Sequence, residues 1–233
     1  PFDELNYGNG WVEGNAAQYT WFVPHDIPGL AELIGGDAAL TEKLNASFLR
    51  SQKHGFVSSK SHDKERLRES RRVYINYGNQ PSIQTAFIFN YAGAPHLTQY
   101  WSRMVADSVY SGISPQLGYS GDEDQGLMGS LAVLIKTGLF SLRGGAGIEP
   151  MYEITSPLFD KVTIHLNRNY YPGDMFVIET NNNSPENRYI RSINLDGEEQ
   201  NSIGIEHNTL VRGGTLKLEM GSIPNTDLRG VEF

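Results

Sequence analysis

The sequence contains no cysteine among its 233 residues. Disulfides, cysteine-ligated zinc sites and cysteine nucleophiles all need a thiol, so these three kinds of site are excluded. Positive charge is also scarce, because 19 Lys and Arg stand against 27 Asp and Glu and give a net charge of −8. A nucleic-acid partner is not expected, since phosphate binding needs clustered Lys and Arg. No apolar run approaches the roughly 20 residues of a membrane-spanning helix.

Several catalytic signatures are missing as well. The sequence has no GxSxG nucleophile elbow, no P-loop and no glycine fingerprint of a dinucleotide site. Its six histidines show no metal-binding spacing such as HExxH. Acyl transfer, phosphoryl transfer and hydride transfer are therefore unsupported.

The spacing of apolar residues changes along the chain. Over residues 1–147 it is helical, as in the helix that Asp37 is predicted to cap, with Leu40, Leu44 and Phe48 on one face. Over residues 148–233 apolar and polar residues alternate, which predicts strands. We therefore expect a helical domain over 1–147, followed by a small antiparallel β-sandwich over 148–233.

Some element boundaries can be predicted more closely. Further helices are expected from Ser82 to Tyr91, from Thr98 onward and from Leu127 to Thr137. The Asp196-Gly197 pair is a strong signal for a hairpin turn.

The first candidate site is the segment WVEGN, in which Glu13 follows Trp11 and precedes further aromatic residues. Aromatic faces stack on sugar rings, and an apolar wall raises the pKa of a carboxyl toward that of a general acid. An aromatic core with Glu13 as a solvent-facing cap explains the same pattern.

The second candidate is the acidic run GDEDQG, which contains Asp122 and Asp124. A calcium-type oxygen site, a general base, and capping of the next helix by Asp124 are all consistent with it. The third is YGNQPS, whose Asn79 and Gln80 suit hydrogen bonds to sugar hydroxyls or oxygen donation to calcium, or an ordinary turn and helix cap. Two carboxylates on separate loops, with aromatic and amide-rich neighbours, indicate glycoside hydrolysis.

Longer segments strengthen this interpretation. VEGNAAQYTWFVPHDIPGLAELIGG, YGNQPS with FIFNYAGAP, GYSGDEDQGLMGSLAVL and SPLFDKVTIHL occur in this order, and the chain resembles glycoside hydrolase family 92 over essentially its whole length. The resemblance implies calcium-dependent, inverting exo-α-mannosidases. It also implies a multidomain fold in which this chain supplies the C-terminal half of an (α/α)6 barrel and then a β-sandwich element. The missing N-terminal part of the same protein would carry further mannose contacts, and the loop-like start of the chain independently indicates a fragment or a cleaved product.

The resemblance assigns roles residue by residue. Glu13 matches the general acid and Asp124 the general base, with Asp122 as a second candidate. Calcium would hold the mannose hydroxyls O2 and O3. Trp11, Asn79 and Gln80 are expected to bind substrate, and Gln84 and Asn79 are expected to bind the metal.

The sequence also departs from the family pattern. Gln80 stands where α-1,2-specific members usually have Glu, so the linkage is left open. The expected function is removal of terminal α-linked mannose from glycoprotein or mannan glycans by a secreted or periplasmic enzyme. The alternatives are hydrolysis of a non-α-1,2 or phosphate-linked mannoside, a carbohydrate-binding module without turnover, and a structural helical domain.

Overall fold

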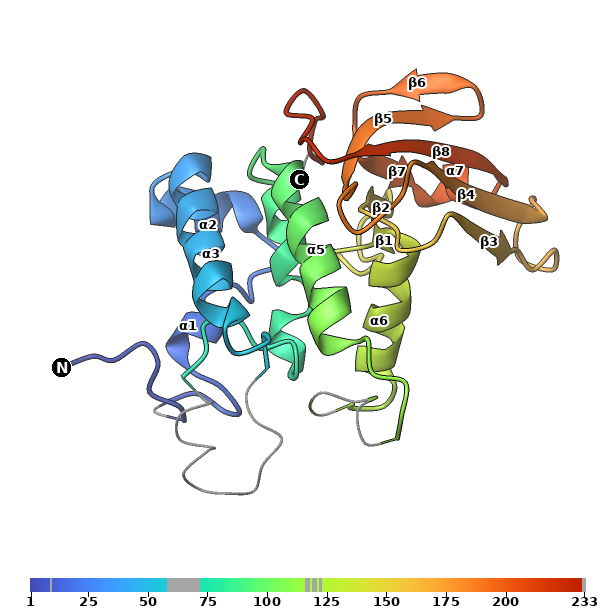
Figure 1. Cartoon of the computed structure of the whole chain (residues 1–233). Helices are drawn as coiled ribbons and strands as arrows, with labels where there is room; N and C mark the ends of the chain where they lie inside the picture. Colours follow the sequence, from blue (N-terminus) through green and yellow to red (C-terminus); the bar gives the residue numbers. More distant parts are fainter. Residues whose placement is uncertain (9, 58–71, 116–117, 119–120, 122, 232–233) are drawn as a thin grey trace. The chain divides into compact units, whose positions relative to one another are not determined.

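The computed structural model describes residues 1–231 apart from 9, 58–71, 116–117, 119–120 and 122 (Figure 1). The chain divides into two compact units. The first unit is Pro1–Ala86 with Met104–Val133, and the second is Phe87–Arg103 with Leu134–Phe233. The sequence-based boundary between residues 147 and 148, and the assignment of the helices to half of an (α/α)6 barrel, remain predictions.

Helices dominate the chain up to residue 137. The helical segments are α1 (Ala16–Tyr19), α2 (Ile27–Ile34), α3 (Asp37–Gln52), η1 (Gln80–Ser82), η2 (Thr85–Asn90), α5 (Pro95–Val109), α6 (Leu127–Thr137) and later the short α7 (His207–Leu210). Helix α3 begins at Asp37, with Gly36 rather than Asp37 at the cap position, and its Leu40, Leu44 and Phe48 are fully buried as predicted. Figure 1 shows α2 beside α3, and the two helices contact each other.

The helix predicted from Ser82 to Tyr91 is wrong in type, because this stretch forms the two 3-10 segments η1 and η2. Pro81 opens η1, and Ala86 to Phe89 are all completely buried. An apolar face with helical spacing predicts an α-helix with one buried side. It does not predict the structure of a segment that is buried on every side. Helix α5 begins three residues before the predicted Thr98, whereas α6 has the predicted bounds.

Strands begin at residue 139. They are β1 (Leu139–Phe140), β2 (Met151–Ile154), β3 (Lys161–His165), β4 (Met175–Asn181), β5 (Tyr189–Leu195), β6 (Glu198–Gln200), β7 (Gly204–Glu206) and β8 (Gly214–Gly221). A three-stranded sheet has the order β1-β2-β7, and a five-stranded sheet has the order β3-β4-β8-β5-β6.

The prediction of a purely antiparallel sandwich needs correction. The last strand, β8, lies between β4 and β5 and runs parallel to β4, with Ile178 opposite Leu216. Alternation along a strand indicates which face is buried, but it does not identify the neighbouring strand. The larger sheet is therefore mixed.

The predicted hairpin at Asp196-Gly197 is confirmed. The two residues connect β5 to β6, and their φ angles are 53° and 94°. Positive φ at both central residues is the requirement of the tight turn that suits the twist of a hairpin.

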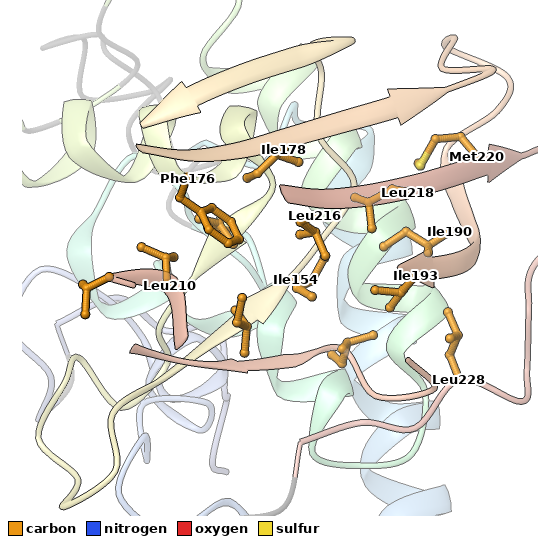
Figure 2. Close-up of a cluster of buried hydrophobic side chains, with 14 residues drawn as sticks. Ile154, Phe176, Ile178, Ile190, Ile193, Leu210, Leu216, Leu218, Met220 and Leu228 are labelled. Atoms are coloured by element: carbon orange, nitrogen blue, oxygen red, sulfur yellow. The ribbon is translucent and has the colours of Figure 1, made fainter. Parts of the chain in front are cut away.

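The two sheets share a hydrophobic core in the second unit (Figure 2). Ile154 from β2 and Phe176, Leu216 and Leu218 from the larger sheet are at most 2% exposed. Alternate residues of β4 and β8 point into this core, as their period-two pattern predicts, whereas Ile190 and Ile193 of β5 are three residues apart because an irregularity interrupts the register between Ile190 and Ser192. This layer of apolar contacts holds the smaller and larger sheets together.

A carboxyl group is buried beside this core. Glu153 on β2 is 1% exposed; it accepts hydrogen bonds from the Leu142 backbone N–H, at 3.0 and 3.2 Å to its two oxygens, and from the Tyr91 hydroxyl. Burial raises the pKa of Glu153 to about 7, against its ordinary value of 4.5. The pKa of Tyr91 is raised too, first by burial and then by the Glu153 charge.

Among the described residues, no helix is long and apolar enough to cross a membrane.

Candidate active site

The loop that carries Glu13 is fixed from its C-terminal side. Asn15 caps α1, since its Oδ1 accepts the Gln18 backbone N–H at 3.0 Å. The side-chain amides of Asn15 and Gln18 both donate to the carbonyl of Val73, at 3.3 and 3.0 Å. All these contacts lie within the first unit, and they tie the end of the loop to a segment 55 or more residues away.

Glu13 itself has an unusual backbone. Its φ is 58°, a left-handed conformation that residues with a side chain seldom adopt. Its carbonyl oxygen accepts a hydrogen bond from Asn79 Nδ2 at 2.9 Å. The side chain is exposed, and its carboxylate has no hydrogen-bond partner among the residues that the structure describes. A strained residue that presents an uncommitted carboxylate to solvent is a candidate for function.

Two aromatic rings stack within the segment that carries Glu13. Trp11 stacks on Tyr19 with 5.2 Å between ring centroids, and the Tyr19 hydroxyl donates to the Val12 carbonyl at 2.6 Å. Burial raises the pKa of Tyr19, and the Glu13 charge adds to that shift. A Cβ atom at Gly14 would lie 2.7 Å from the Tyr19 ring, so the stack requires glycine there. Trp11 remains 38% exposed and offers an aromatic face to a ligand.

The YGNQPS turn is rigid at its base. Tyr77 is fully buried; its hydroxyl accepts the Ala86 backbone N–H at 2.9 Å, and its carbonyl accepts the hydroxyl of Tyr110 at 2.9 Å. Burial raises the pKa of both tyrosines. Asn76 Oδ1 accepts the Gly78 N–H at 3.0 Å and closes the turn. The residues that follow are therefore presented from a fixed support.

Asn79 and Gln84 use their amides within the chain. Besides its bond to Glu13, Asn79 accepts the Gln80 backbone N–H on Oδ1 at 3.0 Å. Gln84 is 2% exposed and donates from Nε2 to the carbonyls of Pro81 and Trp21, at 2.9 and 3.1 Å. Its Oε1 is buried and has no hydrogen-bond partner in the described part of the chain. Gln80 is half-buried beside Asn79.

The acidic loop meets this turn at two glycines. A Cβ atom at Gly121 would lie 2.0 Å from the Gly78 carbonyl oxygen, so the two backbones are in direct contact. Asp124 is exposed at a φ of 47°, and its carboxylate has no hydrogen-bond partner among the described residues. Its neighbour Glu123 accepts the Gly129 backbone N–H at 3.0 Å and so supports the start of α6. Asp122 lies outside the described residues.

The structure therefore brings the three predicted loops to one place in the first unit. The turn at Gly78 and Asn79 contacts the loop of Glu13 on one side and the loop of Asp124 on the other. The contact between Gly78 and Gly121 was not predicted from the sequence. Its one indication there was the glycine in each of the two loops, since glycine permits a close approach of two backbones. No group of three or more His, Asp or Glu side chains with metal-site geometry occurs among the described residues.

Comparison with known proteins identifies the family. The model of the glycosyl hydrolase family 92 catalytic domain matches residues 1–222. An uncharacterized secreted glycosidase of Arthroderma benhamiae is 30% identical over 203 residues, which are 86% of this chain and 22% of that protein.

Two solved structures show how the fold compares. An inverting family 92 mannosidase from Bacteroides thetaiotaomicron is 32% identical, with a TM-score of 0.76 over 98% of this chain and 30% of that one. A family 92 alpha-mannosidase from the same organism has a TM-score of 0.79 at 24% identity, over 97% of this chain and 27% of that one. The chain thus spans less than a third of the length of these relatives. Its sequence and its fold place it in glycosyl hydrolase family 92, as part of the catalytic domain.

Proposed function

We propose that the protein containing this chain is an inverting exo-α-mannosidase that removes terminal α-linked mannose from glycans. The observation that carries the proposal is the meeting of the Glu13 and Asp124 loops at one turn, in a chain that matches the family over residues 1–222. The mannosidases among the related structures support the choice of sugar.

Glu13 is proposed as the general acid. It would give its proton to the glycosidic oxygen while the bond from that oxygen to the anomeric carbon breaks. The exposed face of Trp11 beside it is suited to stacking on a sugar ring. Gln80 is proposed to hydrogen-bond the sugar on the same side.

Asp124 is proposed as the general base. It would take one proton from a water molecule whose oxygen forms the new bond to the anomeric carbon, on the face opposite the leaving group. Inversion needs room for this water, so we expect the two carboxyl groups to lie roughly 6.5–9.5 Å apart in the enzyme. Asp122 is the second candidate for this role.

A calcium ion is part of the proposal, and the donor groups present fit one. Gln84 Oε1 is a buried carbonyl oxygen without a hydrogen-bond partner in the described residues, and such an atom is costly unless something binds it. Amide oxygens are ligands that Ca²⁺ takes readily. Gln84 would hold the ion with Asn79, whose Oδ1 already accepts one hydrogen bond. When bound, a hard cation of this kind would orient and polarise sugar hydroxyls.

Gln80 bears on the linkage that the enzyme cleaves. An amide at this position can donate and accept hydrogen bonds but carries no charge. A non-α-1,2-linked or phosphate-linked mannoside is therefore the alternative substrate, to be compared directly with the α-1,2-linked mannobiose. The enzyme is further proposed to be exported, as the printed name of the fungal relative says of that protein.

Substitution of the two carboxylates tests the proposal. In the full-length protein, Glu13→Gln and Asp124→Asn should each lower kcat on α-linked mannobioses by roughly 10²–10⁴, because each removes one proton transfer. Circular dichroism should show an unchanged fold. An activated aryl α-mannoside should partly rescue Glu13→Gln but not Asp124→Asn, since a good leaving group needs no acid. Wild-type rates in either variant would refute the assignment.

The stereochemistry tests the mechanism. Proton NMR during hydrolysis should show β-mannose as the first product, and EDTA should abolish its release. Initial α-mannose would rule out inversion, and full activity in EDTA would rule out the calcium ion. Saturable mannoside binding without any turnover would favour the carbohydrate-binding module instead.

A further inference from the structure

We infer that Asn79 is a positioning residue for the general acid, and that it acts through the backbone of Glu13. The inference rests on the proposed function and adds a residue to its machinery. It concerns the contact between the side-chain amide of Asn79 and the carbonyl oxygen of Glu13, which is 2.9 Å long.

The first argument is the conformation of Glu13. A left-handed φ of 58° is unfavourable for a residue with a side chain, so other contacts must hold it. Asn79 supplies the hydrogen bond to the carbonyl of this residue across 66 positions of sequence. A hydrogen bond that spans two loops fixes the peptide plane after Glu13, and with it the direction in which the side chain leaves the backbone.

The second argument is the rigidity of Asn79 itself. The residue is 6% exposed, and its Oδ1 accepts the N–H of the next residue, which fixes the rotation of the amide. The Nδ2 donor is thereby aimed at Glu13. The turn below it is closed by Asn76 and supported by the buried Tyr77.

The third argument is that the same turn touches the loop of the base. Gly78, the residue before Asn79, lies against Gly121, three residues before Asp124. One short turn therefore sets the position of both candidate carboxylate loops. A displacement of roughly 1 Å between an acid and its target costs on the order of 10²-fold in rate, so a support of this kind has a measurable effect.

The decisive variant is Asn79→Asp in the full-length protein. Aspartate has the same shape and keeps the oxygen that accepts the Gln80 N–H, but it lacks the Nδ2–H donor for Glu13. With Ca²⁺ kept saturating in every assay, because Asn79 is also a proposed ligand of the ion, we expect kcat on an α-linked mannobiose to fall roughly 10²-fold, with KM unchanged and with near-normal kcat on a dinitrophenyl α-mannoside. Asn79→Ser, which keeps a cap oxygen and also lacks the donor, gives the same test if the aspartate variant does not fold.

The matched control is Asn225→Asp. Asn225 also donates from Nδ2 to a distant carbonyl, that of Arg191, and accepts a nearby backbone N–H on Oδ1, but it lies in the second unit. We expect Asn225→Asp to alter thermal stability. Its kcat relative to the wild type should be the same on the mannobiose and on the dinitrophenyl α-mannoside.

The double variant separates the possible outcomes. Glu13→Gln with Asn79→Asp should be no slower than Glu13→Gln alone, because a positioning residue has no effect once its acid is gone. A raised KM, an equal loss on both substrates, or additive losses in the double variant would overturn the inference. If Glu13→Gln itself shows no dependence on the leaving group, the acid assignment fails as well. If only Asn79→Asp lacks that dependence, the proposed function stands and the positioning role alone is wrong.

Discussion

At the scale of single residues, the buried Glu153 makes stability depend on pH. The folded protein holds a proton on this carboxyl up to a pKa of about 7, whereas in the unfolded chain the group ionises near its ordinary value of 4.5. The free energy of unfolding should therefore fall as the pH rises through this window, by roughly 3 kcal/mol.

Replacing Glu153 with Gln should remove this dependence. At pH 8 we expect Glu153→Gln to melt at a higher temperature than the wild type, because the buried negative charge is gone. At pH 5, where the wild-type carboxyl is itself neutral, the two should melt alike. Thermal unfolding followed at both pH values checks this, with the exposed Glu149→Gln as a control that should leave the pH dependence intact. An unchanged pH dependence in Glu153→Gln would contradict the account.

The two candidate carboxylates share a backbone feature that affects how they are tested. Glu13 and Asp124 have φ values of 58° and 47°, in the left-handed region. Alanine at either position removes the carboxylate and also leaves a residue that tolerates this conformation poorly. Isosteric replacement by Gln or Asn changes the proton chemistry with less disturbance of the loop.

At the scale of elements, the start of α6 depends on Glu123. Its carboxylate accepts the Gly129 N–H at 3.0 Å, in the first turn of the helix, where a negative charge also favours the helix dipole. We expect Glu123→Ala to lower the free energy of unfolding by about 1 kcal/mol, as for other lost helix caps. Glu123→Gln keeps an acceptor oxygen and should cost less, which chemical denaturation can measure. Equal losses in the two variants would mean that the hydrogen bond contributes nothing.

Elements with one buried face were predictable from the sequence, and elements buried on all sides were not. Helix α3 and the strands β3, β4 and β8 follow their apolar periods, and α6 has its predicted bounds, whereas an irregularity in β5 breaks its alternation. The 3-10 segments after Asn79 were missed, since their buried residues point in every direction. The parallel pairing of β8 with β4 was also beyond the sequence, because strand order depends on contacts between distant segments.

At the scale of the whole molecule, calcium should act as a stabilising ligand of the full-length protein. An ion that binds only the folded state adds roughly 2.7 kcal/mol to the free energy of unfolding at 100 times its Kd. Added Ca²⁺ should therefore raise Tm, and EDTA should lower it. Mg²⁺ at the same concentration should do less, because it prefers a smaller octahedral site. A Tm that is the same with Ca²⁺ and with EDTA would speak against a structural calcium site.

The candidate site was predictable as a set of residues but not as an arrangement. Residue types and motifs pointed to Glu13, Asn79 and Asp124, which lie far apart in the sequence. The bond from Asn79 to Glu13 and the approach of Gly121 to Gly78 arise only on folding. An asparagine can bind sugar or metal, and it can equally orient a neighbouring residue. The residue type alone therefore does not distinguish these two roles.

The contact between Gly78 and Gly121 restricts how this site can change over evolutionary time. A side chain at Gly121 would collide with the backbone at Gly78, so the first step toward a longer or bulkier loop there is unfavourable without a compensating change in the turn. Substitutions in the two loops should therefore be strongly epistatic. New substrate preferences would arise more readily at Gln80, whose half-buried side chain takes no part in the contact between the two glycines.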